Sequence, residues 1–567
     1  MLLIAMSWLY SIAISLIIGV GFKSVIKLQN TNTVVLIFFG FFGITLLTTF
    51  CSIFIRVNWE FHLILLSITI AIGYACIENV KEAFSLLKKE ILGLSSFFKI
   101  MLFTSTILIL AKCASSPYLI DNESYYIQTI KWLNEFGLVK GLVNLHPFLG
   151  QTSGWHILQS TFNYSFIYQN FNDLSGFCLL MGNFYAFQKL DAFLFKNEKS
   201  TINLVIGLTP LFNIYFFQFI SAPSPDIAIY IISFIVFFKF IKHYKSTTND
   251  AFIIISLLAI FATFVKLTAI TICLFPLMLL IKSFSELKKQ TVILSIIGVI
   301  TVTLFIIKNT IVSGSPFYPL QISGFLDIDW KMPKSIETFY LSETKYAGYF
   351  TTEQEYQESS NILLFKKWLL LPKLHGFFNK LMVLMLLITP LVLRNKKFNS
   401  AYRLVYIATI LSMLFLFFTS PQYRFFFAFF SFFVLMALSI VLNKKNIISI
   451  SIMLGLSIAA IPLFIPIKLS QLTNNKFHLD LNHFSLKYII KPHNNSRYSN
   501  TSEPLILGNT TINTPTKIDF FWGTGDVDLP ALNKEQLDYF KTYYSIIPQQ
   551  RTSFLKDGFY SKVLIDE

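Results

Sequence analysis

The feature that most constrains this chain is a series of apolar runs, each about 17 to 23 residues long and carrying few or no charges. An α-helix rises about 1.5 Å per residue, so a run of this length crosses a hydrocarbon core about 30 Å thick. The composition agrees, because 54% of the 567 residues are hydrophobic and 13% are charged, whereas soluble domains have about 25% charged residues. The runs exclude a single water-soluble fold and predict an all-α polytopic membrane protein.

The runs predict about fourteen transmembrane helices. The first run has no basic segment before it and no small-residue cleavage site after it, which indicates a retained span rather than a signal peptide. Lys266 and Leu267 alone separate the eighth run from the ninth, so these two could form one broken helix. The expected spans are 2–22, 33–55, 61–78, 92–112, 174–188, 202–220, 226–241, 250–265, 268–281, 290–312, 376–393, 402–418, 424–442 and 447–467.

Basic residues alternate along the connections between these runs. Every second connection is basic, from residues 23–27 near the start to residues 444–445 near the end. The short connections between them hold only Arg56, Lys266 and Arg424. Because basic loops are retained in the cytoplasm, the alternation places the intervening connections outside it. The longer outer segments are residues 113–173, 313–375 and 468–567.

The same distribution explains the net charge of the chain. The formal charge of +16 does not indicate a nucleic-acid partner, because the cations lie in short clusters between apolar runs. The five cysteines lie in or beside apolar runs without metal-ligand spacing, so we interpret them as packing residues. The tail, residues 468–567, has alternating or aromatic stretches at 504–507 and 519–522 and could be a small α+β domain or a loosely folded cap.

Candidate chemistry begins in the first outer loop, just after the fourth run. Asp121 and Glu123 lie about one helical turn beyond this run, and a helix continuing through Tyr125 would have an aromatic face suited to a membrane interface. Asp121 and Tyr125 are four residues apart and would share one face of that helix. The alternative is that Asp121 only caps the helix, because Asp is a common N-cap residue.

Other charged residues lie at the outer ends of later runs. Asp226 follows two prolines at a helix start, where an acidic residue is also common as a cap. Lys266 lies between two apolar runs, where it must pair or snorkel to the interface. The remaining outer polar residues, Lys308, Asn309 and Arg424, could be interfacial anchors.

Together these outer helix ends supply at least two carboxylates and three cations. A carboxylate can accept a proton from a nucleophilic hydroxyl, and fixed cations can neutralise a departing phosphate whose lipid tail stays in the bilayer. This pairing is what chemistry on a lipid-phosphate donor needs. His146 and His156 lie in the same loop as Asp121. Nothing in the sequence identifies the two histidines as metal ligands, so a divalent metal is possible but not indicated. They are either ordinary interfacial histidines or residues that contact the donor phosphate or the sugar.

These residues resemble the C-type (GT-C) integral-membrane glycosyltransferases, which use polyprenyl-phosphate sugars. In that family an Asp, often Asp-Glu, follows a span in the first outer loop with an aromatic residue one turn later, and Asp121, Glu123 and Tyr125 occupy those places. The resemblance covers roughly residues 92–445, and Ala-Pro-Ser-Pro-Asp226 further resembles a group of uncharacterised bacterial membrane proteins. The family pair appears here as Asp121-Asn122-Glu123, so either carboxylate could be the base.

The resemblance implies five regions along the chain. Three N-terminal helices precede a GT-C-like module of seven helices, and a long outer loop, four further helices and the outer tail follow it. The regions are residues 1–91, 92–312 with outer loop 113–173, 313–375, 376–467 and 468–567.

The resemblance also implies an inverting glycosyltransferase of cell-surface glycan synthesis, acting at the extracytoplasmic membrane face. Asp121, or else Glu123, would be the catalytic base and Asp226 would assist it. The partners would be a polyprenyl-phosphate sugar donor, a glycan, lipid or protein acceptor and the lipid bilayer, with no cofactor. The expected substrate-binding residues are Tyr125, His146, His156, Lys266, Lys308, Asn309 and Arg424.

Two alternatives remain open from the sequence. An O-antigen polymerase or ligase would rely on outer-loop arginines, which are scarce here. A lipid-linked sugar flippase or transporter would need midplane charges and an internal repeat, and neither is clear. The Lys-, Asn-, Ile- and Phe-rich composition is typical of AT-rich bacterial genomes, which favours a bacterial inner (plasma) membrane location.

Overall fold

A computed structural model describes residues 1–29, 31–117, 119–171, 173–320, 327–465, 467 and 484–564. All candidate site residues fall within these ranges. Parts of the expected outer segments, at positions 118, 172, 321–326, 468–483 and 565–567, lie outside the described residues.

The described chain is mostly helical, and eight of its helices are long and apolar enough to cross a membrane. Each overlaps one of the spans expected from the apolar runs. The described residues therefore support the expected all-α membrane protein, but with eight candidate membrane spans rather than about fourteen. These helices are α1 (Leu2–Val25), α2 (Thr33–Cys51), α5 (Ser96–Ala114), α14 (Phe284–Ser313), α18 (Lys373–Val392), α19 (Ser400–Thr419), α20 (Tyr423–Val441) and α21 (Lys445–Phe464).

The other expected spans correspond to shorter, bent or more polar helices. The third run is divided between α3 and α4, which meet at an angle of 96°. The eighth and ninth runs form two short helical segments separated at Lys266, which adopts extended backbone and is followed by a 3-10 segment. The elements are α3 (Trp59–Ala75), α4 (Ile77–Leu92), α8 (Leu174–Phe195), α9 (Thr201–Gly207), η4 (Thr209–Phe212), α10 (Asn213–Phe216), α11 (Pro225–His243), α12 (Asn249–Val265), η5 (Leu267–Cys273) and α13 (Leu274–Lys282).

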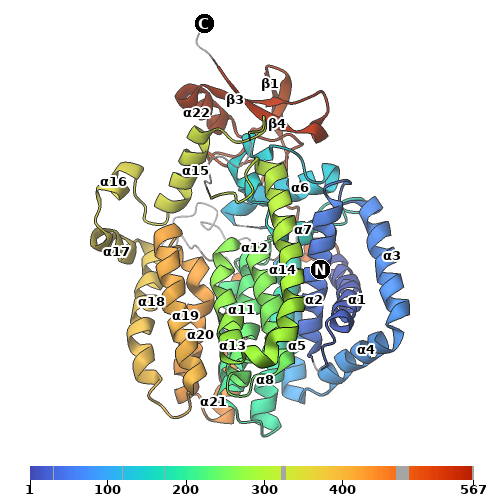
Figure 1. Ribbon diagram of the computed structural model, residues 1–567, viewed down its shortest axis with the longest axis vertical. Coiled ribbons are helices and arrows are strands. Elements are labelled where there is room, and N and C mark those ends of the chain that lie inside the picture. Colours follow the sequence, from blue (N-terminus) through green and yellow to red (C-terminus); the bar gives the residue numbers. More distant parts are fainter. Residues whose placement is uncertain are drawn as a thin grey trace.

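The helices form one body whose centre is held by α11 and α12 (Figure 1). Nearly every residue of these two helices is buried, which explains why both are apolar on all sides. At the edge, α1 and α2 pack so closely that a Cβ added at Gly40 would lie 1.8 Å from the carbonyl oxygen of Ser15. Small residues permit this approach, which is typical of membrane helix pairs.

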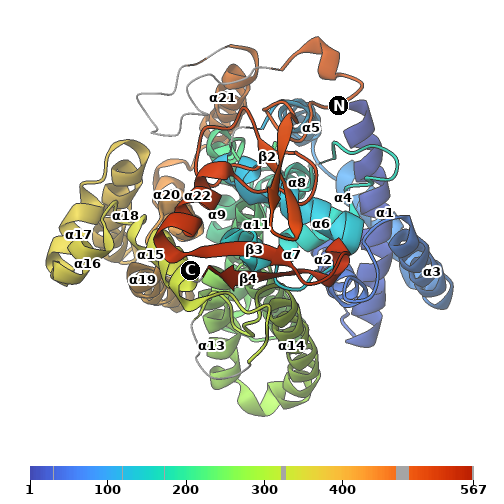
Figure 2. The same cartoon turned by 90° about the horizontal axis from the view of Figure 1, so that it is seen from above.

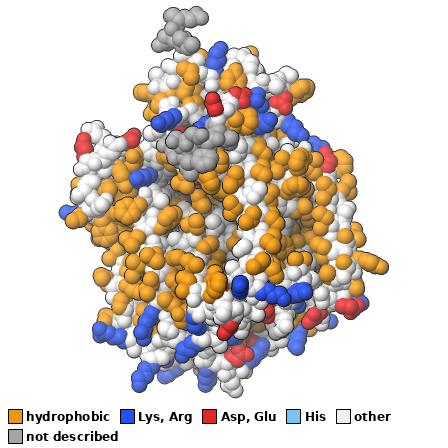
Figure 3. Space-filling model, viewed as in Figure 1, with side chains coloured by type: hydrophobic (Ala, Val, Ile, Leu, Met, Phe, Trp, Pro, Cys, Tyr) orange, Lys and Arg blue, Asp and Glu red, His pale blue; other side chains and the backbone are white. Residues whose placement is uncertain are grey.

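The surface of this body carries a broad apolar band. Figure 3 shows hydrophobic side chains covering the helices on one face, with Lys and Arg side chains gathered at the end opposite the C-terminal strands. This segregation agrees with the alternating basic connections of the sequence. A band of this kind is what a lipid-facing surface requires.

Residues 484–564 form a small α+β unit over one end of the helices, which we call the cap (Figures 1 and 2). β1 pairs with β2 and β3 pairs with β4, both antiparallel. The stretch at 504–507 lies in β1, whereas 519–522 lies in a bend and turn, and the tail forms the α+β alternative. The elements are η7 (Leu486–Tyr488), β1 (Ser502–Leu507), β2 (Thr510–Pro515), α22 (Lys534–Tyr544), β3 (Ile546–Gln550), η8 (Leu555–Asp557) and β4 (Phe559–Val563).

The two long polar loops lie at the same end as the cap. The amides of Thr524 and Gly525 in the cap donate to the carbonyl oxygen of Glu123 at 2.8 and 2.7 Å, and the Phe559 amide donates to the Lys140 carbonyl at 3.0 Å. The cap and the first loop are therefore joined by backbone hydrogen bonds. The loops contain η1 (Asn122–Tyr126), α6 (Ile127–Phe136), η2 (Leu142–Asn144), η3 (Pro147–Gln151), α7 (Gly154–Thr161), α15 (Lys334–Tyr346), α16 (Glu353–Glu358) and α17 (Asn361–Leu369).

Candidate functional site

Four charged side chains from distant parts of the sequence meet beneath the cap, and we call Asp121, Asp226, Lys266 and Arg424 the charge cluster. Each lies at the end of a helix: Asp121 directly precedes η1, Asp226 is in the first turn of α11, Lys266 follows α12, and Arg424 is in the first turn of α20. Their helix-end positions let charged groups gather at a polar boundary while the helices themselves remain apolar.

Each carboxylate of the cluster has a cationic partner. Arg424 Nη1 lies 2.5 Å from Asp121 Oδ2, and Lys266 forms an ion pair with Asp226. The aromatic ring of Phe425 lies beside both cations, with its centroid 4.2 Å from Lys266 Nζ and 5.2 Å from Arg424 Cζ. The two ion pairs are thus neighbours around one ring.

The cluster is largely removed from solvent. The side chains of Asp226 and Lys266 are 3% and 19% exposed, and those of Asp121 and Arg424 are 21% and 27% exposed. Buried charges are costly unless they are paired, so these four residues support one another. Within the described residues Asp226 Oδ2 has no hydrogen-bond partner, which leaves one carboxylate oxygen able to accept a further donor.

Asp121 is held as a carboxylate. Burial raises its pKa, but the Arg424 guanidinium outweighs that effect and the pKa lies below the usual range for Asp. The residue is at the N-terminal boundary of η1 but makes no capping hydrogen bond with its side chain. Its partner is the arginine, so capping does not account for its position.

A π-helical turn changes the spacing expected after Asp121. The sequence predicts that Tyr125, four residues on, shares a face with Asp121, but η1 is a π-helix with i to i+5 periodicity. Tyr126, five residues on, therefore donates its hydroxyl to Asp121 Oδ2 at 3.3 Å. Tyr125 instead stacks on Phe148, with ring centroids 5.1 Å apart. Tyr125 therefore lies near the cluster, but it contacts the ring of Phe148 rather than Asp121.

Glu123 points away from the charge cluster and into the cap. Its carboxylate accepts hydrogen bonds from the Ser496 hydroxyl at 2.5 Å and the Arg497 amide at 3.1 Å. Thr524 and Gly525 bind its backbone carbonyl, as described above. Of the two candidate bases in the first loop, Asp121 therefore belongs to the cluster and Glu123 to the attachment of the cap.

The attachment made by Glu123 is expected to depend on pH. Burial raises the pKa of Glu123 to about 7, although the bonds from Ser496 and Arg497 lower it. The ordinary pKa of Glu is 4.5. Between pH 4.5 and about pH 7, Glu123 is therefore protonated in the folded chain but ionised in the unfolded chain. Stability from this group is therefore complete below pH 4.5 and is lost as the pH rises through 7, by at most about 3 kcal/mol.

The measurement is the melting temperature of the purified protein in detergent between pH 5 and pH 8. The wild type should melt at lower temperature as the pH rises, and Glu123→Gln, which does not ionise, should have a smaller slope. Glu82→Gln on the exposed face of α4 is the matched control and should keep the wild-type slope. An unchanged slope for Glu123→Gln would contradict this account.

The two histidines of the first loop are buried and differ in their surroundings. His156 in α7 lies with its ring 4.4 Å from that of Tyr126, and burial, the largest effect, lowers its pKa to about 3. Its ring nitrogens make no hydrogen bond of normal geometry among the described residues, although the Pro223 carbonyl is nearby. His146 faces the cap, where the Trp522 carbonyl lies 3.2 Å from Nε2, and burial lowers its pKa to about 4. Both are neutral near pH 7, and only His156 borders the cluster.

Lys308 and Asn309 support the site rather than line it. The Lys308 ammonium donates to the carbonyls of Gln151 and Thr152 and to Asn309 Oδ1. Asn309 donates in turn to the Pro316 carbonyl at 3.2 Å. The residues fix the segment that leads into α7 and so hold His156 in place.

Three contributors to the cluster are not among the residues singled out from the sequence. Tyr126 binds Asp121, Gln422 accepts a hydrogen bond from Arg424 Nε at 2.9 Å, and Phe425 packs against both cations. Their nearness to Asp121 or Arg424 in the sequence is the one signal that could have found them. Among the described residues no group of three or more His, Cys, Asp and Glu side chains could hold a metal ion.

The arrangement can accept a proton at a buried carboxylate and bind an anion between two cations. A family model described as "Domain of unknown function (DUF8201)" matches residues 1–431, a stretch that contains the whole charge cluster and ends before the cap. No curated protein and no solved structure matches the chain.

Proposed function

The chain belongs to the family described as Domain of unknown function (DUF8201), whose description assigns no activity, and from that premise we propose a function on the basis of the charge cluster itself. The protein is an inverting glycosyltransferase that uses a polyprenyl-phosphate sugar donor at the extracytoplasmic membrane face. The single observation that carries this proposal is the buried pairing of two carboxylates with two cations at the ends of apolar helices.

The proposed reaction assigns each member of the cluster a role. An acceptor hydroxyl attacks the anomeric carbon of the sugar, a new C–O bond forms, and the bond from that carbon to the phosphate oxygen breaks. The hydroxyl proton passes to the Asp121 carboxylate, and the bonding pair leaves with the lipid phosphate. Lys266 and Arg424 stabilise the phosphate charge, while Asp226 orients Lys266 and accepts a bond from the acceptor through Oδ2.

Donor binding and base activation are coupled in this proposal. The cations that pair with Asp121 and Asp226 are the same ones that a phosphate would bind. A donor phosphate entering the cluster therefore competes with Asp121 for Arg424. As the guanidinium turns toward the phosphate, its lowering effect on the pKa of Asp121 weakens, so Asp121 becomes a stronger base only when the donor is present.

The proposed topology follows from the same assignment. The cap, the first loop and α15 lie at the cluster end of the helices, and the Lys- and Arg-rich end lies opposite (Figures 1 and 3). With basic connections in the cytoplasm, the cluster faces outward. We place residues 92–312 in a GT-C-like catalytic module with about fourteen spans in the whole chain, counting α3 and the helices from α8 to α13.

The test is transfer or hydrolysis of radiolabelled polyprenyl-phosphate sugars by the purified protein in detergent. A panel of phosphate-linked hexoses should reveal at least one donor that is turned over. Lys266→Ala should raise the KM for that donor and lower kcat, because one of the two phosphate-binding cations is removed. Absence of turnover with every donor in the panel would overturn the proposal.

One observation favours a second candidate function. Arg424 lies at the centre of the cluster, and a polymerase or ligase acting on a pyrophosphate-linked oligosaccharide would rely on such an arginine. That activity predicts turnover of undecaprenyl-pyrophosphate oligosaccharide but of none of the phosphate-linked monosaccharides. The same panel, extended by this donor, separates the two functions.

A further inference from the structure

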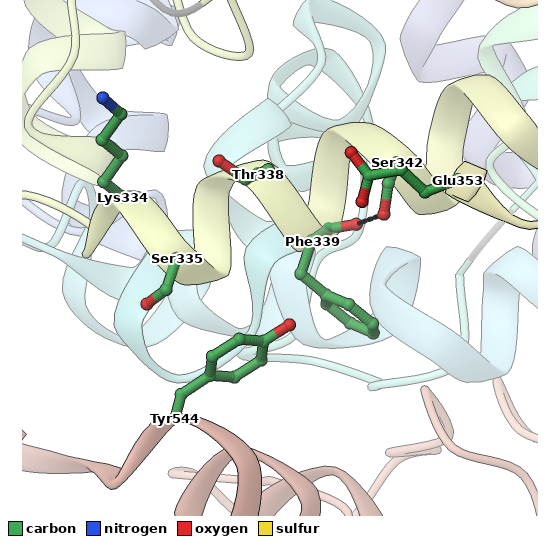
Figure 4. A pocket seen from close by; sticks show the side chains of 7 residues that line it. All are labelled: Lys334, Ser335, Thr338, Phe339, Ser342, Glu353 and Tyr544. Atoms are coloured by element: carbon green, nitrogen blue, oxygen red, sulfur yellow. Dashed lines mark hydrogen bonds between the residues drawn. The ribbon is translucent and has the colours of Figure 1, made fainter. Parts of the chain in front are cut away.

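A cleft of about 450 Å³ lies in the outer region, between α15, the start of α16 and the end of α22 (Figure 4). We call it the cap cleft. Its size falls within the range of about 300 to 1,000 Å³ typical of ligand sites. It is lined by Lys334, Ser335, Thr338, Phe339, Ser342, Glu353 and Tyr544.

The lining is a mixture of hydroxyl groups and aromatic rings. One face of α15 supplies Ser335, Thr338 and Ser342, and Figure 4 shows Phe339 and Ser335 turned toward Tyr544 of α22. The rings of Phe339 and Tyr544 lie 6.1 Å apart at an interplanar angle of 59°. Hydroxyl groups exchange hydrogen bonds with other hydroxyls, and aromatic faces pack against C–H groups.

The charges of the cleft nearly cancel. Lys334 is the cation and Glu353 the carboxylate, so the lining has no net charge for an anionic ligand to recognise. The lining also has apolar surface, most of it from the rings of Phe339 and Tyr544. A neutral molecule with many hydroxyls and some C–H surface matches this lining best.

A series of aromatic contacts leads from the cleft toward the charge cluster. Phe339 lies 6.1 Å from Trp522, Trp522 lies 5.2 Å from Phe148, and Phe148 stacks on Tyr125, all measured between ring centroids. Phe339, Trp522 and Phe148 are each partly exposed. The rings therefore offer apolar faces along a path from the cleft to the loop that carries Asp121.

We propose that the cap cleft binds sugar residues of a glycan, which would be the acceptor of the reaction. The assignment as acceptor rests on the proposed function, whereas the binding of a saccharide does not. Ser335 hydrogen-bonds to the sugar hydroxyls, and Ser342 accepts from them because its own proton is donated to the Phe339 carbonyl. Tyr544 and Phe339 pack against the sugar C–H face. A chain held there would extend along the aromatic path with its end near Asp121.

The test is saturation-transfer NMR and calorimetry of the full-length protein in detergent with soluble tetrasaccharides of glucose, mannose, galactose and N-acetylglucosamine. At least one of these probes should bind. Tyr544→Ala should weaken its binding at least tenfold, because the ring opposite α15 is lost. Tyr543→Ala is the matched control, since the neighbouring Tyr543 is 69% exposed and does not line the cleft.

A second variant distinguishes loss of the cleft from misfolding of Tyr544→Ala. Ser335→Trp places a large ring in the cleft from an exposed position of α15, so it should block binding while leaving the melting temperature unchanged. Saccharide binding that is unchanged in both Tyr544→Ala and Ser335→Trp would overturn the proposal. Failure of the wild type to bind any of the tetrasaccharides would overturn it as well.

Asp121→Asn separates this inference from the proposed function. The variant should bind the saccharide as the wild type does, because Asp121 is not part of the cleft. Saccharide binding without any transfer in the wild type would reject the glycosyltransferase and leave the cleft as a glycan-binding site. Transfer in the wild type without effect of either cleft variant would reject the cleft alone.

Discussion

Replacing Asp121 by asparagine is expected to reduce glycosyl transfer by about 10²- to 10⁴-fold, the usual contribution of a general base. Asparagine has nearly the same shape, so Tyr126 and Arg424 keep a hydrogen-bond partner at this position. Donor binding should be retained, because Arg424 is then free of a competing carboxylate. The measurement compares kcat and donor affinity of the purified variant with those of the wild type.

Glu123→Gln is the matched control for this prediction. Glu123 lies two residues on and also carries a carboxyl group, but this group is bound to Ser496 and Arg497 of the cap. Its replacement should leave kcat within several-fold of the wild type. Full activity of Asp121→Asn, or an equal loss in Glu123→Gln, would show that Asp121 is not the base.

The pH profile gives an independent check on Asp121. Arg424 holds the pKa of Asp121 below its usual range in the protein without donor. The pH profile of kcat/KM reports the free enzyme, and that of kcat reports the complex in which a phosphate competes for Arg424. The acid limb of kcat/KM should therefore lie at lower pH than the acid limb of kcat. Coincident limbs would mean that Arg424 does not change partners.

Replacing Asp226 by asparagine is expected to destabilise the protein by about 3 kcal/mol, because it leaves the Lys266 ammonium without its buried partner. The double variant Asp226→Asn, Lys266→Met should recover most of this loss, since no unpaired charge remains and the apolar side chain packs against Phe425. Unfolding in mixed micelles with an increasing fraction of SDS measures both free energies.

The exposed pair Lys81–Glu78 on α4 is the matched control for this cycle. Its side chains are 65% and 80% exposed, so Glu78→Gln should change stability by less than about 1 kcal/mol. Equal effects of Asp226→Asn and Glu78→Gln would mean that burial does not strengthen the Lys266 pair. A double variant no more stable than Asp226→Asn would show that Lys266 has another compensating partner.

The sequence predicts the helical membrane fold well, because the constraint is local. A run of about 20 apolar residues determines its own length and environment without reference to the rest of the chain. Where local breaks intervene, prediction is poorer. The extended backbone at Lys266 and the 96° bend between α3 and α4 depend on packing, and composition alone does not reveal them.

The cluster is partly predictable for a related reason. Asp121, Asp226, Lys266 and Arg424 each stand out as charges at the ends of apolar runs. Which carboxylate meets which cation depends on how α11, α12 and α20 pack, and that information is not local. From the sequence alone, capping, snorkelling and anchoring are valid alternatives for these residues, and the pairing in the structure decides between them.

Two details of the site could not be predicted by helical periodicity. The π-helical turn moves Tyr126 into the place expected for Tyr125, because it adds one residue to the turn. Lys308 has the same outer helix-end position as the cluster residues, yet its ammonium binds the carbonyls of Gln151 and Thr152. Spacing and charge indicate candidates, but hydrogen-bond partners decide their roles.

The separation of the ion-pair partners along the chain has a consequence for synthesis at the ribosome. Lys266 follows Asp226 by 40 residues, whereas Arg424 follows Asp121 by 303 residues. At about 5 to 20 residues per second, Arg424 emerges roughly 15 to 60 s after Asp121. Throughout that interval Asp121 must stay hydrated or protonated at the membrane boundary, so the Asp121–Arg424 pair forms only after most of the helices have been synthesised.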